Sequence, residues 1–458
     1  MATQSQSTEA AASRDSTPYP SSFAAWYSIA VLLLMYVFSF IDRTTISLIV
    51  EPMKRDLHIS DTQIGMLQGL AFALLYTFLG LPIARLSDRR SRRGIIAAGA
   101  LIWSIMATFC GLARTALQLF VARIGVGVGE AALSPAAYSI ITDSFPRSRL
   151  GRAFGVYNIG ITIGAGVAFL VGGIVVAAVS KTGATYTLPL LGEVRAWQMV
   201  FIVTGAPGIV LPLLLLTFRE PARRGLLRAT ADGAVALRPP LKEVLRYIWL
   251  NRKFYCLHFV AMALLALCGY AVAAWLPTAI HRAYGVSYGQ VGKVLGVSTI
   301  LINSTGMLLG GILCDRLTRK GHKDAPIIVA LLSACGIAGL SCWPTLMPTV
   351  TLVWIAIFVS GLTFNAYNGV GPQAVNQVTP NQYRAQVSAV YLFVVNVLGL
   401  WVGPTLVPLL NEHLFHDPVK IRYSLIIVVF LAAVTAITLL WIVRPIYRQK
   451  IADAAEWQ

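Results

Sequence analysis

Charged residues are scarce in this chain of 458 residues, and acidic residues are scarcer than basic ones. Asp, Glu, Lys and Arg make up 12% of the sequence, hydrophobic residues make up 57%, and the mean hydropathy is +0.70. An ordinary soluble domain carries roughly 25% charged residues. The composition therefore excludes a soluble protein and indicates an integral membrane protein. The 37 Lys and Arg against 19 Asp and Glu are explained by basic cytoplasmic loops, with no need for a nucleic-acid partner.

Other common features are also missing. None of the six cysteines forms a Cys-x-x-Cys pair, and all lie in or beside apolar runs, so we expect neither disulfides nor a metal site. Residues 1–23 lack the segments of a signal peptide and are predicted to be a disordered cytoplasmic tail. No phosphate-binding loop is present, which excludes ATP as the direct energy source. No histidine is expected beside the acidic residues of the spans, which argues against a membrane-embedded acyltransferase.

Long apolar runs are abundant, and twelve of them can cross a bilayer as helices. A basic, proline-containing segment follows the sixth run, so we predict a bundle at 24–217, a cytoplasmic linker at 218–252, a second bundle at 253–446 and a cytoplasmic tail at 447–458. An even number of spans and the basic loops predict that both termini lie in the cytoplasm, and we expect a multi-pass protein of a bacterial inner membrane. The predicted spans are 24–50, 62–86, 94–112, 116–141, 151–179, 197–217, 253–280, 290–314, 325–344, 349–378, 384–410 and 421–445.

The two halves repeat one another. Asp88-Arg89 follows the second span and Asp315-Arg316 follows the eighth, an offset of 315 − 88 = 227 residues. A second landmark, Pro-(x)10-Tyr after spans four and ten, recurs at the similar offset of 380 − 146 = 234 residues. Two landmarks at nearly one offset favour a duplication of six spans. The fold class is therefore predicted as all-α, with two pseudo-repeated six-helix bundles.

The Asp-Arg loops suggest a cytoplasmic latch. Asp88 and Asp315 can accept hydrogen bonds from the amides at a neighbouring helix N-terminus. Arginines of these loops, Arg89 and Arg316 among them, can pair with acids such as Asp143. Such a latch would close the two halves on the inner side and release them when they rock. Arg90, Arg92 and Arg93 are instead assigned to setting the topology.

Four charges lie inside the predicted spans. Arg123 and Glu130 are seven residues apart, close to two helical turns, so their side chains share a face. Asp42 and Arg43 lie at a depth in the first span similar to that of Arg123 in the antiparallel fourth. A charge at mid-membrane costs roughly 2.5–3.5 kcal/mol, so we expect all four to face one cavity. The alternative is a buried ion pair that only fixes helix packing.

These residues resemble those of the major facilitator superfamily, whose signature loop between helices two and three is similar to the Asp-Arg loops. Phe40-Ile41-Asp42-Arg43, Trp103-Ser104 and Arg123-Ile-Gly-Val-Gly-Val-Gly-Glu130-Ala131 are similar to the Spinster group of lysolipid and sphingolipid transporters. The resemblance implies that Asp42 and Glu130 form a proton or conformational switch with Arg43 and Arg123 as counter-charges. It also implies an amphiphilic substrate with a polar head and an acyl tail.

The second half carries neutral polar residues where the first carries charges, and a cavity with two such walls would suit an amphiphile. For any single amide, an interhelical hydrogen bond is the alternative role. We expect a proton-coupled transporter without a cofactor that works as a monomer by alternating access. The alternatives are a transporter of a small organic anion, sugar or drug, and, more remotely, a lipid enzyme or a non-transporting receptor. The candidate cavity residues are Tyr76, Asn158, Thr162, Tyr270, Trp275, Asn303, Asn365, Tyr367, Asn368 and Asn396.

Overall fold

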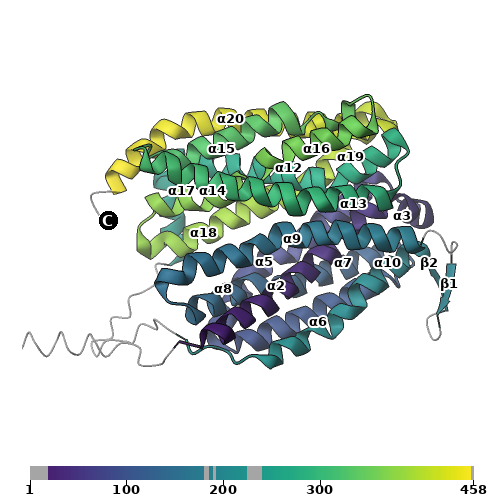
Figure 1. Ribbon diagram of the computed structural model, residues 1–458, viewed down its shortest axis with the longest axis horizontal. Coiled ribbons are helices and arrows are strands. Elements are labelled where there is room, and N and C mark those ends of the chain that lie inside the picture. Colours follow the sequence, from purple (N-terminus) through teal and green to yellow (C-terminus); the bar gives the residue numbers. More distant parts are fainter. Residues whose placement is uncertain (1–18, 180–184, 189–191, 224–239, 455–458) are drawn as a thin grey trace, which may run out of the picture.

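The computed structural model describes residues 19–179, 185–188, 192–223 and 240–454. Long helices run side by side in two bundles, one from each half of the chain (Figure 1). The start of the first span, at Ser22, and the end of the last, at Ala454, lie at the same end of the molecule. We call this end the terminal face and the opposite end the distal face.

The first bundle contains six spans. Several of them are interrupted by short 3-10 segments, here labelled η1 to η3, or by turns. A two-stranded antiparallel hairpin, which the sequence analysis did not predict, follows the fifth span on the distal face and pairs Thr185 with Arg195. In chain order the elements are α2 (Ser22–Thr44), η1 (Thr45–Leu48), α3 (Val50–Leu57), α4 (Asp61–Gln68), α5 (Leu70–Arg89), α6 (Arg92–Cys110), α7 (Ala116–Glu130), α8 (Leu133–Ser144), α9 (Arg147–Val179), β1 (Thr185–Leu188), β2 (Gly192–Arg195), α10 (Ala196–Gly205), η2 (Ala206–Ile209) and η3 (Leu211–Thr217).

The second bundle repeats this plan, with π-helical turns (η4, η5, η7, η8) inside or at the end of three spans. Its elements are α11 (Leu241–Leu250), α12 (Arg252–Tyr284), α13 (Tyr288–Ser298), η4 (Thr299–Asn303), α14 (Ser304–Arg319), α15 (Ala325–Gly336), η5 (Ile337–Ser341), η6 (Pro344–Leu346), α16 (Val350–Phe364), α17 (Tyr367–Val378), α18 (Asn381–Val395), η7 (Asn396–Val402), α19 (Gly403–Leu410), η8 (Asn411–Phe415), η9 (Pro418–Lys420) and α20 (Ile421–Ala454). Within the described residues, 12 helical stretches are long and apolar enough to cross a membrane, so the predicted number of spans is confirmed.

The segments outside the predicted bundles contain more helix than expected. Residues 241–250 of the predicted linker form α11, and α20 continues into the predicted C-terminal tail, where Tyr447 is fully buried. The predicted N-terminal tail falls largely on residues 1–18, and much of the linker on 224–239, both outside the described residues. The exact limits of the predicted domains remain predictions.

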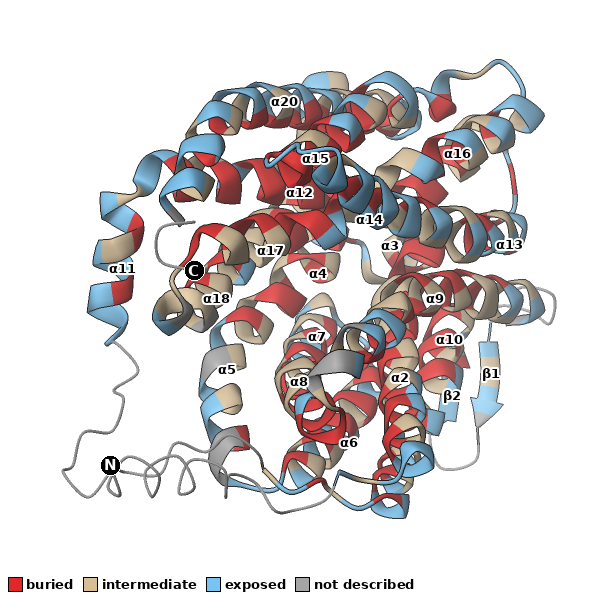
Figure 2. Cartoon of the chain, turned by 60° about the vertical axis from the view of Figure 1, so that its left-hand side comes forward, coloured by how far each residue is buried: buried red, intermediate tan, exposed pale blue. Residues whose placement is uncertain are grey.

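Each bundle has an apolar outer surface as well as an apolar interior. Leu117, Leu431 and Trp441 each expose more than half of their surface. Figure 2 shows buried faces turned inward within each bundle and exposed faces outward. Such exposure would be costly in water, but it is the expected surface of a protein surrounded by lipid, where helices satisfy their backbone polar groups internally.

The two bundles meet mainly along their distal halves. There α9 packs on α13, and α4 packs on α19. A Cβ atom on Gly65 would lie 2.5 Å from the carbonyl oxygen of Pro404, and one on Gly173 would lie 3.0 Å from the Cα of Gly292. Glycine is therefore needed for these backbones to approach so closely.

Polar contacts between the bundles are also concentrated in the distal half of the molecule. Arg282 of α12 binds Glu51 and Asp61 on the distal face, and Glu412 accepts a hydrogen bond from Thr62 at 2.6 Å. Near the middle of α9, Thr162 accepts a hydrogen bond from Ser304 at 2.7 Å. No hydrogen bond or ion pair between two described residues joins the bundles on the terminal side of this contact. The structure is thus closed distally.

The close contact between α9 and α13 gives a first prediction. In Gly292→Ala the new Cβ would lie 2.5 Å from the carbonyl oxygen of Phe169, so the helices must separate, and we expect a loss of about 1–3 kcal/mol of stability. Thermal unfolding of the purified protein in detergent measures the loss. Gly311→Ala is the matched control, because its Cβ meets nothing within 4 Å in the same span. Equal unfolding temperatures for the two variants would contradict the prediction.

Candidate functional site

Glu130 lies at a break in the fourth span. The helix α7 ends at Glu130, and α8 begins at Leu133 after two turn residues. Pro135 has no N–H and cannot donate to the carbonyl of Ala131, which favours a break at this position. The Glu130 side chain is buried, at 2% exposure, so its charge requires a partner inside the membrane.

That partner is Arg43. Oε2 of Glu130 accepts hydrogen bonds from Nε of Arg43 at 2.6 Å and from Oγ of Ser39 at 2.5 Å, and the second guanidinium nitrogen of Arg43 lies 2.5 Å away. The other carboxylate oxygen, Oε1, is buried and has no hydrogen-bond partner among the described residues. One oxygen of Glu130 therefore carries the ion pair, and the second takes no part in it.

Aromatic rings surround the Arg43 guanidinium. Its central carbon lies 4.3 Å from the ring centre of Phe72, 4.9 Å from that of Tyr76 and 5.2 Å from that of Phe40. The ring faces attract the cation. Gly127 permits this arrangement, because a Cβ there would collide with the carbonyl oxygen of Phe72.

Asp42 and Arg123 are also in contact, but the contact is made by the backbone carbonyl of Asp42 and not by its carboxylate. One terminal nitrogen of Arg123 donates to the backbone carbonyl of Asp42 at 3.1 Å. Oδ1 of Asp42 and Nε of Arg123 are buried, and within the part of the chain that the structure describes neither atom has a hydrogen-bond partner. Arg123 thus holds the end of α2 just before it tightens into η1, while the Asp42 carboxylate keeps unused hydrogen-bonding capacity.

The structure brings all four predicted charges to one place in the first bundle. It adds Ser39 and Phe72, which the sequence analysis did not select. Ser39 lies four residues before Arg43, so helical spacing alone could have indicated it. Phe72 had no such signal, because its position depends on how closely α5 approaches α7.

The structure describes three of the five predicted latch residues, Asp143, Asp315 and Arg316. Asp315 and Arg316 are exposed, and the side chains of Asp88 and Arg89 lie outside the described residues. Asp143 pairs with Arg92, which also binds Glu220 with 2.8 Å between Nε and Oε1. These contacts lie within one half of the chain and do not join the two bundles.

Arg92 therefore requires a correction. The sequence analysis assigned it to topology alone, but its side chain is 1% exposed and holds two acids. Burial would raise the pKa of Glu220, but hydrogen bonds from Arg92 and Ser91 outweigh burial and hold that pKa below its usual value. Arg92 thus connects α6 with the end of α8 and the chain beyond η3.

Asp324 has a similar role in the second bundle and gives a second prediction. Its Oδ2 accepts hydrogen bonds from Arg444 at 2.5 Å and Arg448 at 2.9 Å. Burial would raise the pKa of Asp324, but these arginines outweigh it and lower the pKa from its usual value. A lowered pKa stabilises the fold above the unfolded value of about 3.9, and the stabilisation is lost as pH falls through the folded value.

We therefore expect Asp324→Asn to cost about 1–3 kcal/mol of stability at pH 7 and progressively less below about pH 4. Thermal unfolding measured across this pH range tests both parts. Asp453→Asn is the control, since Asp453 is 66% exposed and lies 4.0 Å from Lys450. A pH-independent difference between the two variants would refute the assigned role.

The candidate cavity residues fall into three groups. The ring of Tyr76 lies beside the Arg43 guanidinium, and Tyr270 interacts electrostatically with Arg43. Thr162 bridges the two bundles. The other candidates make contacts within their own bundle. Asn158 accepts a hydrogen bond from the hydroxyl of Tyr138, and Asn368 donates a hydrogen bond to Asn365. Asn303 packs against Gly361, Tyr367 is buried beside Gly269, and Asn396 is half-buried at the start of η7.

Trp275 is a second correction. Its indole is fully buried and donates to the carbonyl of Pro404 at 2.7 Å, so it packs α12 on α19 and does not line a cavity. The spans also contain a histidine. His258 of α12 lies inside a span, fully buried, with Nε2 at 3.1 Å from the carbonyl oxygen of Gly371. It belongs to the second bundle, away from the charges.

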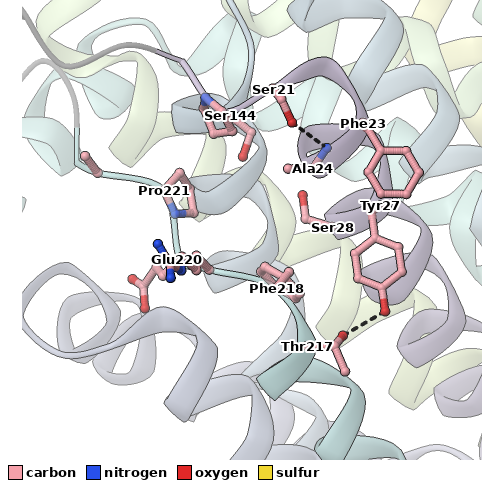
Figure 3. A pocket seen from close by; sticks show the side chains of 13 residues that line it. Ser21, Phe23, Ala24, Tyr27, Ser28, Ser144, Thr217, Phe218, Glu220 and Pro221 are labelled. Atoms are coloured by element: carbon pink, nitrogen blue, oxygen red, sulfur yellow. Dashed lines mark hydrogen bonds between the residues drawn. The ribbon is translucent and has the colours of Figure 1, made fainter.

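A pocket of about 670 Å³ opens on the terminal face between the start of α2 and the end of η3. Figure 3 shows Phe23 and Tyr27 along one side, with Tyr27 hydrogen-bonded to Thr217 at 2.8 Å. Glu220, already engaged by Arg92, is among its lining residues. None of the four charges Asp42, Arg43, Arg123 and Glu130 lines it, so the pocket is separate from the candidate site.

The sequence model of the Major Facilitator Superfamily matches residues 32–404, most of the chain. The chain belongs to the major facilitator superfamily. A solved bacterial homologue of the human lysosomal transporter Spinster, in an inward-facing and unoccupied conformation, is similar to this transporter at a TM-score of 0.76 and 27% identity, covering 95% of this chain and 99% of the other. The Spinster-like resemblance, the two-bundle fold and the assignment to transporters rather than enzymes are thereby confirmed.

Two further relatives of this major facilitator protein are transporters. An MFS-type efflux pump of Mycolicibacterium smegmatis is 28% identical over 448 residues, covering 94% of this chain and 95% of the relative. A probable L-galactonate transporter of Escherichia coli is 25% identical over 430 residues, covering 91% and 89%. One relative is an efflux pump and the other a probable sugar-acid transporter, so membership of the superfamily does not by itself define the substrate.

Proposed function

We propose that this transporter couples substrate movement to protons, with Glu130 as the group that binds and releases the proton. The observation that carries the proposal is the buried Glu130 carboxylate, held by Arg43 through Oε2 and unpartnered at Oε1. A proton on Oε1 would neutralise the carboxylate and weaken its attraction for Arg43. Asp42 belongs to the same group of charges, so a proton on either carboxylate would affect the other.

The freed Arg43 would then bind an anionic head group. Its guanidinium presents fixed donors that suit a phosphate or carboxylate, and the surrounding rings of Phe40, Phe72 and Tyr76 offer an apolar wall beside it. Tyr270 of the second bundle interacts electrostatically with Arg43. This combination supports a lysolipid-like amphiphile, in line with the similarity to the Spinster homologue.

Rocking of the two bundles would supply alternating access. The distal contacts of Arg282 close one side in this structure, and rocking would exchange them for contacts on the terminal side. A membrane potential supplies about 2.3 kcal/mol per charge per 100 mV. One proton can therefore drive roughly fifty-fold accumulation at that potential alone.

A second candidate substrate is a small organic anion such as a sugar acid. The similarity to the galactonate transporter favours it, and Arg43 would bind the carboxylate of such a substrate in the same way. The two candidates share the proposed proton site and differ in whether an acyl tail is needed.

The test is proton movement in liposomes that contain the purified protein and an internal pH dye. We expect lysophosphatidylglycerol to drive proton movement in the natural protein, and expect Glu130→Gln and Asp42→Asn to abolish it. Glu243→Gln, which removes a carboxylate on the terminal face, should keep it. A response to galactonate but not to the lysolipid would select the second candidate. Equal responses in all four proteins would refute the proton site.

A further inference from the structure

The short helix α11 has a buried face that fixes it to the second bundle. Val244 and Ile248, four residues apart, are buried, and the helix packs on α18. Tyr247 stacks on Tyr383 of α18 with ring centres 4.8 Å apart. The hydroxyl of Tyr383 also donates to Glu243 at 2.6 Å, so the acidic group of this helix already has a partner.

A second face of α11 is apolar and exposed. Leu241, Leu245 and Trp249 recur every four residues and therefore form one stripe, with 47%, 48% and 65% of their surfaces exposed. Leu250 beside them is 68% exposed. Figure 2 shows the helix at the edge of the terminal face with its outer side exposed. A stripe of this kind in water would be unfavourable.

A row of cations lies next to this stripe. Lys242 and Arg246 are four residues apart and exposed, and neither makes a hydrogen bond or ion pair with any described residue. Beyond the helix, the guanidinium of Arg252 lies 5.2 Å from the Trp249 ring, and Lys253 is exposed. The local charge is thus strongly positive, with Glu243 as the single acid between residues 240 and 254.

The position of α11 identifies what covers the stripe. Only Asn251 separates it from α12, the seventh membrane span, so its C-terminal end must lie at the membrane boundary. An exposed Trp next to Lys and Arg is typical of segments at the interface between acyl chains and head groups.

We propose that α11 is an interfacial helix whose apolar stripe enters the bilayer surface and whose cations, Lys242 and Arg246, bind the head groups of anionic phospholipids. Each cation near an anionic membrane surface strengthens binding by about fivefold. The proposal depends on the membrane placement of α12 and not on the substrate or on proton coupling.

Hydrogen exchange of the α11 amides in lipid nanodiscs tests the proposal. We expect α11 to be better protected in discs that contain phosphatidylglycerol than in discs of phosphatidylcholine alone. The double variant Lys242→Gln, Arg246→Gln should lose most of this difference, about fivefold for each cation. The matched control is Lys320→Gln, Lys323→Gln, which removes two exposed cations from another loop of the terminal face and should keep the difference.

A further variant separates the apolar stripe from the charges. Trp249→Ser should reduce protection of α11 in both kinds of disc, because it removes the anchor that does not depend on lipid charge. Equal protection in the two lipids, or equal behaviour of the two double variants, would overturn the proposal. Protection that appears only when two copies share a disc would assign this face to a second copy of the chain and would overturn it as well.

Discussion

Replacing Arg43 with methionine should lower the stability of this transporter by about 3–5 kcal/mol, the cost of leaving a buried charge without its partner. The Glu130 carboxylate is buried and receives both its cationic hydrogen bond and its closest ion-pair contact from Arg43. The substitution also removes the cation from the rings of Phe72 and Tyr76. Thermal unfolding in detergent at neutral pH measures the loss.

The double variant Arg43→Met, Glu130→Gln is the control for this prediction. It removes both charges, so most of the lost stability should return. If the double variant is as unstable as Arg43→Met, packing rather than charge explains the effect, and the ion pair is not the central interaction of the site.

Replacing Arg282 with glutamine should open the distal side of the transporter. Two nitrogens of Arg282 bind the two carboxylate oxygens of Asp61 at 2.7 and 2.9 Å, and Nε binds Glu51 at 2.6 Å. The Arg282 side chain is 6% exposed, so these charge-assisted bonds are protected from water. Truncating one partner of such a buried set costs about 2–5 kcal/mol, and 2 kcal/mol corresponds to roughly thirty-fold in the open-to-closed ratio.

Distances between spin labels on α3 and α13, at the distal ends of the two bundles, report this equilibrium. We expect a longer distance to become populated in Arg282→Gln. Arg195→Gln is the matched control on the same face, because Arg195 is 48% exposed and pairs with Asp56 at 3.5 Å within the first half. Identical distance distributions in the two variants would show that the Arg282 cluster does not hold the distal side closed.

Much of the fold follows from local properties of the sequence. The twelve spans were predictable because lipid excludes unpaired backbone groups, which leaves a long apolar run few options other than a helix. The convergence of Asp42, Arg43, Arg123 and Glu130 was also predictable, because helical spacing and depth along two antiparallel spans are simple geometry. The exposed stripe of α11 follows the same spacing, although the segment was predicted as a linker.

Other features depended on distances between helices that no local pattern encodes. Glu130 had two candidate arginines, and the choice of Arg43 over Arg123 depends on helix rotation and on the close approach of α5 and α7 at Gly127. Similarly, Trp275 in an apolar span was predicted to line a cavity, but it packs against α19.

By itself, the sequence determined the membrane class, the twelve spans, the internal repeat and the four charges of one site, because each depends on composition or on spacing along one helix. Only the tertiary structure decided that Arg43 neutralises Glu130, that Arg92 is structural, and that Arg282 closes the distal side against Asp61, 221 residues away in the chain. Partner choice between charges is decided by side-chain positions within a few ångströms, and those positions are set by the packing of helices that the sequence separates widely.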